Sequence, residues 1–487
     1  MPLILPGNVA SATAAGYEVA NSLRVNDDDS PRLYKSNGTP TSRRKFTFSC
    51  WVKRSSLDEE SDMHMIFDIN GNDNRFYIGF FGDKIRINGN NNGVTTNDLK
   101  TNRIFKDFSA WYHICVAVDT EQGTAANRVK LYVNGTQETS FTTETYYDED
   151  EDTAVDESDV ELLEYKDNPG HYLDGYLAEV VYIDGSQEAV TSFGEFDSNS
   201  PTIWKPIDVS GLTFGTNGFY LDFEDSDNLG NDANGGTDFT GVNLDATDSA
   251  TDTPTNNFCT LNPLSRGDLS NNAVLSQGNN YYSSDKYGYN HRYGTMGASN
   301  GKWYWEMKYI SHNMHGNSNS FGMAQVISGQ HMPQGVQWGG QVQYEYSYAY
   351  YSIGPPAVGE IWENNSGTLY GATILTALNQ IGMVAMDLDN NRVYFGVDGI
   401  WTASGDPAAG SNGYTIVDAS ITPEGFYFPV VHDRSVNRSY DYAINFGGCP
   451  AFTISSGNAD GNDYGNFEYA VPSGFYALCT KNLAEFG

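Results

Sequence analysis

The sequence predicts an all-β protein made of two antiparallel β-sandwiches in tandem, and three observations support this prediction. Glycine and aromatic residues are frequent, with 51 Gly, 33 Tyr and an aromatic content of 14%, a composition typical of strands joined by tight turns. No long stretch shows the i, i+3, i+4, i+7 spacing of an amphipathic helix. One hairpin pattern occurs twice, in residues 114–135 and 381–399, which indicates two related domains.

The chain length fits two such domains, because all-β domains commonly run to about 200–250 residues. We predict a first domain over residues 1–224, a linker over 225–257 and a second domain over 258–487. The linker prediction rests on a tract rich in Asp, Asn, Gly and Thr without a strand pattern.

The repeated hairpin has the same parts in both copies. An apolar run ends in Asp119 or Asp387, a polar turn follows, and an alternating strand ends at Asn134-Gly135 or Asp398-Gly399. Such dipeptides are strong signals for tight hairpin turns. A second interpretation also stays open, in which two unrelated sheets use the same common turn chemistry.

Several segments of the first domain alternate as strands do. They are 46–53, 65–69, 76–81, 84–87, 111–118 and 173–185. Four motifs, Phe-Ser-Cys-Trp-Val (48–52), Trp-Tyr-His-Ile-Cys-Val-Ala-Val-Asp (111–119), Arg-Val-Lys-Leu-Tyr-Val-Asn-Gly (128–135) and Gly-Tyr-Leu-Ala-Glu-Val-Val-Tyr-Ile-Asp-Gly (175–185), together resemble the laminin-G-like or concanavalin-A-like jelly roll over about residues 40–190. The resemblance implies two stacked antiparallel sheets that bind glycans or proteins, sometimes with calcium at the rim. It carries over no binding residues.

An acidic insertion, residues 144–164, interrupts this pattern. Asp148-Glu-Asp-Glu-Asp152 is a continuous acidic run, and no Lys or Arg occurs between Lys130 and Lys166. One interpretation is a solvated, mobile loop, because blocks of like charge repel. The other is calcium binding by Asp148, Asp150 and Asp152, or by loop carboxylates at the sandwich rims, because calcium prefers carboxylate oxygens. The basic cluster Arg43-Arg44-Lys45 is expected to be a solvated edge.

The second domain contains motifs in a familiar order. They are Gly-Lys-Trp-Tyr-Trp-Glu (301–306), Phe-Gly-Met-Ala (321–324), Phe-Gly-Val-Asp-Gly (395–399), Tyr-Phe-Pro-Val-Val (427–431) and Ile-Asn-Phe-Gly (444–447). Together they resemble a SPRY domain. The resemblance implies another bent β-sandwich that binds protein partners through its loops, without catalytic residues.

Tyrosines provide the candidate contact residues. Tyr281, Tyr282, Tyr287, Tyr289 and Tyr293 lie in a stretch rich in Gly, Asn and Ser, which we expect to be a loop. We predict that these five bind the ligand, with an intersubunit contact as the alternative.

A second set of tyrosines alternates along one segment. Tyr344, Tyr346, Tyr348 and Tyr350 share one face of a strand. Two interpretations remain open, a sandwich core and an exposed aromatic shelf.

Charge and motif content exclude several functions. A net charge of −35 and a pI of about 4.3 argue against binding to nucleic acid or to an anionic membrane. The start resembles no signal peptide, and no segment is long and apolar enough to span a bilayer. The five cysteines are scattered without CxxC spacing, so we expect buried free thiols, with a Cys50–Cys115 disulfide as the alternative. We expect no enzyme, because catalytic motifs are absent and the lone Glu345 lacks the second carboxylate that glycoside hydrolysis needs.

The connector between the domains carries a further resemblance. Two segments are similar to virion proteins of tailed bacteriophages. They are the opening Met1–Ala10 and the stretch from Trp204-Lys-Pro to Asp252-Thr-Pro-Thr-Asn-Asn-Phe-Cys-Thr-Leu-Asn-Pro-Leu264. This implies a tail-fibre-like appendage protein that attaches to a host glycan or protein, forms a homotrimer and contacts other virion proteins. It would be made in the host cytoplasm without a signal peptide. The alternatives are a structural virion protein that bridges subunits or decorates the particle, and a glycan-degrading enzyme.

Overall fold

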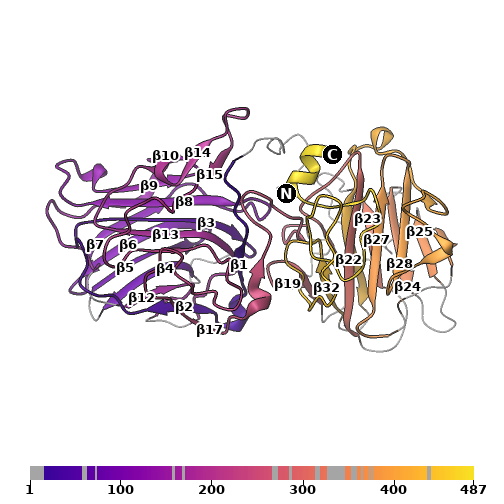
Figure 1. Ribbon diagram of the computed structural model, residues 1–487, viewed down its shortest axis with the longest axis horizontal. Helices are drawn as coiled ribbons and strands as arrows, with labels where there is room; N and C mark the ends of the chain where they lie inside the picture. The colour runs from indigo at the N-terminus through magenta and orange to yellow at the C-terminus, as the bar shows by residue number, and fades with distance from the viewer. Residues whose placement is uncertain are drawn as a thin grey trace. The chain divides into compact units, whose positions relative to one another are not determined.

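The chain folds into two compact units, whose described parts are residues 16–255 and 256–487 (Figure 1). The computed structural model describes residues 16–57, 63–71, 74–155, 159–166, 170–265, 273–284, 288–312, 319–325, 346–352, 359–363, 366–371, 375, 377–435 and 440–487. Both units are antiparallel β-sandwiches, so the predicted fold class is confirmed.

The first unit contains two stacked sheets. In spatial order, sheet 1 contains β10 (Thr136–Glu138), β9 (Val129–Val133), β8 (Tyr112–Asp119), β3 (Lys45–Arg54), β13 (Gly175–Asp184), β1 (Ser22–Val25) and β18 (Ser249–Ala250), with β16 (Phe219–Leu221) paired to β13. Sheet 2 contains β11 (Phe141–Thr145), β7 (Val94–Thr101), β6 (Lys84–Asn91), β5 (Asn74–Phe81), β4 (Met63–Gly71), β12 (Asp159–Leu162), β2 (Arg32–Lys35) and β17 (Thr240–Val242). A small separate pair joins β14 (Gly194–Phe196) and β15 (Trp204–Pro206).

The core of the first unit lies between these sheets. Alternate residues of each strand face inward, as in Phe46, Phe48 and Cys50 of β3 and Phe76 and Ile78 of β5, all fully buried. Aromatic edges pack there, with the ring centroids of Phe46 and Phe76 5.0 Å apart. A period of two along each strand produces this division into an inner and an outer face.

One cation is also enclosed beside this core. The Lys35 ammonium lies 4.8 Å from the ring centroid of Phe219 and 5.0 Å from that of Phe239. Burial lowers the pKa of Lys35, while the carboxylates of Asp232 and Asp238 oppose this shift.

The predicted linker is instead part of the first unit. β17 pairs with β2 and β18 pairs with β1, so two short strands within residues 225–255 extend the two sheets. Deep inside, the Lys53 ammonium lies 2.7 Å from the Asp252 carboxylate, and each side chain is 1% exposed. Composition alone could not reveal an ion pair between groups 199 positions apart, so the linker prediction was wrong.

The acidic insertion 144–164 is also structured where it is described. It contains the end of β11 and all of β12, and β12 lies inside sheet 2 between β4 and β2. Val160 and Leu162 of β12 are buried in the core. The alternation of these apolar residues with acidic ones fits a strand, so this part is not a mobile loop.

The second unit is likewise built from two sheets. Sheet 3 contains β19 (Ala273–Ser276), β20 (Tyr281–Ser284), β32 (Tyr440–Asn445), β22 (Lys302–His312), β27 (Ile381–Asp387), β28 (Arg392–Val397) and β29 (Ile400–Trp401); β30 (Tyr414–Thr415) pairs with β28, and β33 (Tyr476–Ala477) runs parallel to β22. Sheet 4 contains β21 (Gly288–Tyr293), β31 (Phe428–Ser435), β23 (Asn319–Ala324), β24 (Ser347–Ser352), β25 (Gly359–Glu363) and β26 (Ser366–Leu369).

Tyrosines fill much of this second core. Tyr348 and Tyr350 are fully buried there and Tyr346 packs against it, which decides for the core interpretation of these three residues. Tyr344 lies outside the described residues, as does Glu345.

Both predicted hairpins form, as β8–β9 and β27–β28. Their return strands end in two-residue turns, where Asn134, Gly135, Asp398 and Gly399 all have φ between 49° and 81°. Positive φ at both turn positions is the geometry that Asn-Gly and Asp-Gly favour.

Helices are short. They are the 3₁₀ turns η2 (Asp27–Asp29), η3 (Ala125–Asn127), η4 (Val190–Ser192), η5 (Ala246–Asp248), η7 (Thr402–Ser404) and η8 (Ala419–Ile421), and α1 (Thr480–Phe486). Among the described residues, none of the helices has the length and apolar character needed to cross a bilayer. All five cysteines are buried and free, as predicted.

Candidate binding site on the outer face of sheet 2

The strands β4 to β7 turn a row of polar and aromatic side chains away from the core. Tyr77 of β5 stands opposite Asp68 of β4 and Asn88 of β6, and Asn88 stands opposite Asp98 of β7. Inward residues such as Ile78 are fully buried in the core, so this row lies on the outer face. We call the outward side chains of β4 to β7 the Tyr77 face.

Two arginine–carboxylate pairs frame this face. Arg75 donates from Nε and Nη2 to the two Asp68 oxygens at 3.0 and 2.5 Å. Arg86 donates in the same bidentate way to Asp98 at 2.8 and 2.7 Å, and this hydrogen bonding raises the pKa of Arg86. Bidentate pairs hold both groups in a fixed plane. The charges of the four side chains therefore balance on the protein itself.

Aromatic rings complete the frame. The Arg75 guanidinium lies 3.3 Å from the ring centroid of Tyr165, and Tyr77 meets Tyr165 edge to face at 5.9 Å. Burial raises the pKa of Tyr77 to about 12, so its hydroxyl stays protonated at neutral pH and can both donate and accept.

Several polar groups of this region have no hydrogen-bond partner in the part of the chain that the structure describes. Asn88 is 4% exposed, and neither its side chain nor the Tyr77 hydroxyl forms a hydrogen bond there. The neighbouring Asn70 Nδ2, Asn90 Oδ1 and Glu161 Oε2 are buried and unpaired. Buried polar groups are normally satisfied. These groups offer donors and acceptors to water or to a hydroxyl-rich ligand.

The predicted tyrosine set does not form one exposed loop. Tyr281 and Tyr282 belong to β20 and Tyr293 ends β21. Tyr282 is fully buried and stacks on Tyr442 at 5.6 Å, and Tyr293 is 7% exposed. The loop expectation was therefore wrong for these three, because strand pairing with β32 and β31 draws them into the sandwich.

The other two members of the set are less well defined. Tyr287 lies outside the described residues, and of Tyr289 only its place in β21 is described. Their role in ligand binding stays a prediction.

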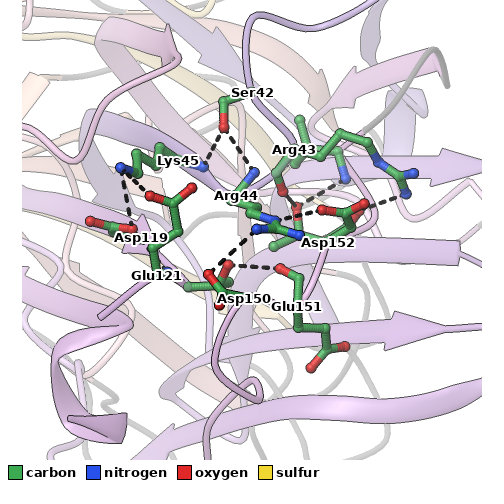
Figure 2. A network of polar contacts seen from close by, with 12 residues as sticks. Ser42, Arg43, Arg44, Lys45, Asp119, Glu121, Asp150, Glu151 and Asp152 are labelled. Atoms are coloured by element: carbon green, nitrogen blue, oxygen red, sulfur yellow. Dashed lines mark hydrogen bonds and ion pairs between the residues drawn. The ribbon is translucent and has the colours of Figure 1, made fainter. Parts of the chain in front are cut away.

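Two of the three predicted calcium residues, Asp150 and Asp152, pair with Arg44 (Figure 2). Arg44 lies 2.8 Å from the Asp152 carboxylate and 3.4 Å from that of Asp150. Glu151, between them, accepts hydrogen bonds from Asn91 and from the Asp148 amide. Arg44 of the basic cluster therefore forms exposed ion pairs with two residues of the run. Calcium binding by Asp148, Asp150 and Asp152 stays a prediction.

No group of three or more His, Cys, Asp or Glu side chains suited to a metal occurs among the described residues.

One buried histidine, His113, lies beside a serine, an arrangement that also occurs in the serine–histidine pairs of hydrolases. His113 Nε2 lies 2.8 Å from Ser49 Oγ, and Trp204 donates to His113 Nδ1 at 3.1 Å. An indole nitrogen can only donate, so Nδ1 accepts and Nε2 carries the proton. Burial also lowers the pKa of His113 to about 3. This imidazole donates to Ser49 and cannot act as the base that activates a nucleophile.

A buried carboxyl, that of Glu179, lies on the outer face of sheet 1 at a strained backbone position. Glu179 has φ 50° at a bulge of β13, and its Oε2 accepts from Tyr17 at 3.1 Å and Tyr220 at 2.9 Å. Burial raises the pKa of Glu179 to about 7, and the carboxylates of Asp222 and Glu224 contribute to the rise.

Sequence reasoning missed the Tyr77 face, although a signal for it was present. The sequence predicts the strand at residues 76–81, which contains Tyr77. A strict period of two assigns Arg75 and Tyr77 to one face. The unpaired state of Asn88 depends on neighbours from three strands and has no sequence signal.

Comparisons with known proteins agree with the fold of the first unit. A laminin-G-type family model, described as the concanavalin A-like lectin/glucanases superfamily, matches residues 27–189. No curated protein sequence matches the chain.

Three solved structures are similar at low TM-score. The SPRY domain of human HERC1 is 12% identical, with 40% of this chain and 99% of that chain covered and a TM-score of 0.26. A heptameric SAP-like pentraxin from Limulus polyphemus is 15% identical, covering 36% and 82%, with a TM-score of 0.28. A putative carbohydrate binding protein from Bacteroides ovatus is 14% identical, covering 46% and 58%, with a TM-score of 0.31.

Proposed function

We propose that the first unit binds a glycan on the Tyr77 face. The observation that carries this proposal is the set of unpaired polar groups around Asn88, since amides and hydroxyls match the donors and acceptors of sugar hydroxyls. The family model that matches residues 27–189 describes lectins and glucanases, which supports the same ligand class.

The charges of the face point to an uncharged ligand. Arg75 and Arg86 are already bound in bidentate pairs with Asp68 and Asp98. An acidic sugar would have to compete with these carboxylates and with the net charge of −35. A neutral glycan forms hydrogen bonds without disturbing either pair.

Calorimetric titration of the full chain with neutral host polysaccharide fragments tests this proposal. Asn88→Ala removes an amide from the centre of the face, and we expect at least about tenfold weaker binding, because about 1.4 kcal/mol corresponds to a factor of ten. The matched control is Asn199→Ala, an exposed asparagine whose amide side chain forms no hydrogen bond among the described residues. An unchanged Kd for Asn88→Ala would place the site elsewhere.

We further propose that this binding serves attachment, with the chain as a non-enzymatic component of a phage virion appendage, most simply a homotrimer. The resemblance of residues 204–264 to phage virion proteins supports this role, and several copies would add avidity to weak single sites. Purified protein should compete with virions for host cells, whereas Asn88→Ala should not. Release of sugar from the polysaccharide by the purified protein would contradict the non-enzymatic role. If the purified wild-type protein leaves the adsorption of virions to host cells undiminished, structural bridging would be favoured instead.

A further inference from the structure

Two polar side chains of opposite kind lie near each other on the Tyr77 face, where β4 meets β12. Asn70 of β4 stands opposite Asp159 of β12, and Glu161 lies two positions further along β12. Since Ile69 and Val160 are buried in the core, the period of two turns Asn70 and Glu161 to the outer face. Diagonal neighbours of this kind have Cα atoms about 7–8 Å apart.

Each of these two side chains has a buried polar atom without a hydrogen-bond partner in the described part of the chain. Asn70 is 7% exposed, and its Nδ2 is a donor without an acceptor. Glu161 is 5% exposed, and its Oε2 is an acceptor without a donor. A ligand group that satisfies both atoms therefore has to offer one acceptor and one donor.

A lysine side chain lies beside the carboxylate of this pair. Lys166 Nζ is 2.9 Å from Asp159 Oδ2 and 3.7 Å from Glu161 Oε1, and the Lys166 side chain is 34% exposed. An exposed ion pair contributes little to stability. The Lys166 side chain can therefore move aside at low cost and open Glu161 Oε2 to a ligand.

An aromatic ring lies next to the same place. Arg75 stands opposite Asn70, and its guanidinium lies 3.3 Å from the ring centroid of Tyr165. The Lys166 amide, next in the chain, donates to Asp68 Oδ2 at 3.3 Å. These two contacts hold the half-buried Tyr165 ring over the face, where it offers apolar surface to a small group such as a methyl.

We propose, on the premise that the Tyr77 face binds a glycan, that Asn70 and Glu161 recognise the acetamido group of an N-acetylhexosamine. A trans secondary amide presents its N–H and its C=O on opposite sides, and the atoms that bond to them lie about 7–8 Å apart. The ligand N–H donates to Glu161 Oε2, the ligand C=O accepts from Asn70 Nδ2, and the methyl group packs against Tyr165.

A sugar hydroxyl at the same position is too short to reach both groups, so one of them stays unpaired, which is unfavourable. The acetamido group is also uncharged. It therefore agrees with the neutral ligand of the proposed function.

The acetamido position and Asn88 lie on one line across sheet 2. Glu161, Asp68, Tyr77 and Asn88 are successive cross-strand partners. Strands about 4.8 Å apart place Glu161 about 14 Å from Asn88. A ligand that reaches both positions is therefore an oligosaccharide and not a single sugar.

Calorimetric titration of the full chain with two matched trisaccharides tests this inference. They are tri-N-acetylchitotriose and cellotriose, which differ only in carrying an acetamido group or a hydroxyl at the second carbon of each ring. We expect the acetylated trimer to bind with a Kd at least about tenfold lower. Asn70→Ala and Glu161→Ala should each remove most of this preference and leave the Kd for cellotriose unchanged.

Two further variants serve as controls. Lys166→Ala removes only the covering side chain, so it should bind the acetylated trimer at least as tightly as wild type, and weaker binding would assign the contact to Lys166 instead. Asn199→Ala should bind both trimers as wild type does. Melting temperatures check that each variant is folded.

Equal Kd values of the wild type for the two trimers, or no binding of either, would overturn the inference. So would a preference that survives in both Asn70→Ala and Glu161→Ala. Equal Kd values that Asn88→Ala still weakens would leave the proposed glycan binding intact. A preference that depends on Asn70 and Glu161 while Asn88→Ala binds normally would keep the acetamido site and contradict the central role of Asn88.

Discussion

The buried ion pair between Lys53 and Asp252 should be decisive for the stability of the first unit. Lys53 Nζ lies 2.7 Å from Asp252 Oδ2, and the Trp111 indole donates to Asp252 Oδ1 at 3.0 Å. Both charged side chains are 1% exposed. Asp252→Ala leaves a buried ammonium without this carboxylate, which costs about 3–5 kcal/mol for a buried pair. For a unit of this size each kcal/mol lowers the melting temperature by about 2–4 °C.

Differential scanning calorimetry of the full chain should therefore show a loss of about 6–20 °C for the first unit. The transition of the second unit serves as the internal reference. The double variant Lys53→Met with Asp252→Leu should recover most of the loss, because an apolar pair replaces the buried charges. Glu195→Ala, which breaks a 3.2 Å pair with Lys205 at an exposed carboxylate, should change little. A loss below about 2 °C for Asp252→Ala would refute the reasoning, because it would correspond to less than about 1 kcal/mol.

Three further predictions concern the same unit. Limited proteolysis of the native chain should spare residues 225–255, because this tract pairs in both sheets, and early cleavage there would contradict the pairing. Lys35→Met should raise the melting temperature at pH 7, since burial lowers the pKa of Lys35 from 10.5. The gain should be a few degrees, at about 2–4 °C per kcal/mol, and should shrink above about pH 10.4, where the amine is neutral in both states; equal curves at both pH values would argue against it. The pKa of Glu179 rises from 4.5 to about 7 on folding, so the native state binds the extra proton and stability should fall as pH rises between these values. Urea denaturation should show that Glu179→Gln removes this slope and gains roughly 3 kcal/mol at pH 8, at about 1.36 kcal/mol per unit; an unaltered slope would assign it to other groups.

Local pattern predicted the strands well. The hairpins at 114–135 and 381–399 form as expected. Their alternating residues favour strands, and the Asn-Gly and Asp-Gly dipeptides adopt the positive φ that the tight turns need. The core position of Tyr348 and Tyr350 also follows from alternation. In each case the residues that determine the structure are close in sequence.

Pairing between residues far apart in the sequence could not be predicted in the same way. The Gly and Asn neighbours of Tyr282 predict a loop, yet β20 pairs with β32 about 160 positions later, as Tyr282 opposite Tyr442 shows. The pairing of Arg44 with Asp150 and Asp152 likewise has no local signal, because these residues are 106 and 108 positions apart. The sequence did not predict the Tyr77 face for a related reason. Whether the Asn88 amide has a hydrogen-bond partner depends on which side chains the neighbouring strands place beside it.

The pairing of β17 with β2 and of β18 with β1 also bears on how the chain is made at the ribosome. β1 and β2 emerge first, but the strands that cover their free edges, at residues 240–250, emerge more than 200 residues later. At about 5–20 residues per second, synthesis leaves those edges open for roughly ten seconds or more. An uncovered edge strand can pair with another nascent chain. The late tract thus shields the first unit against aggregation, and expression of residues 1–224 alone would remove that shield permanently.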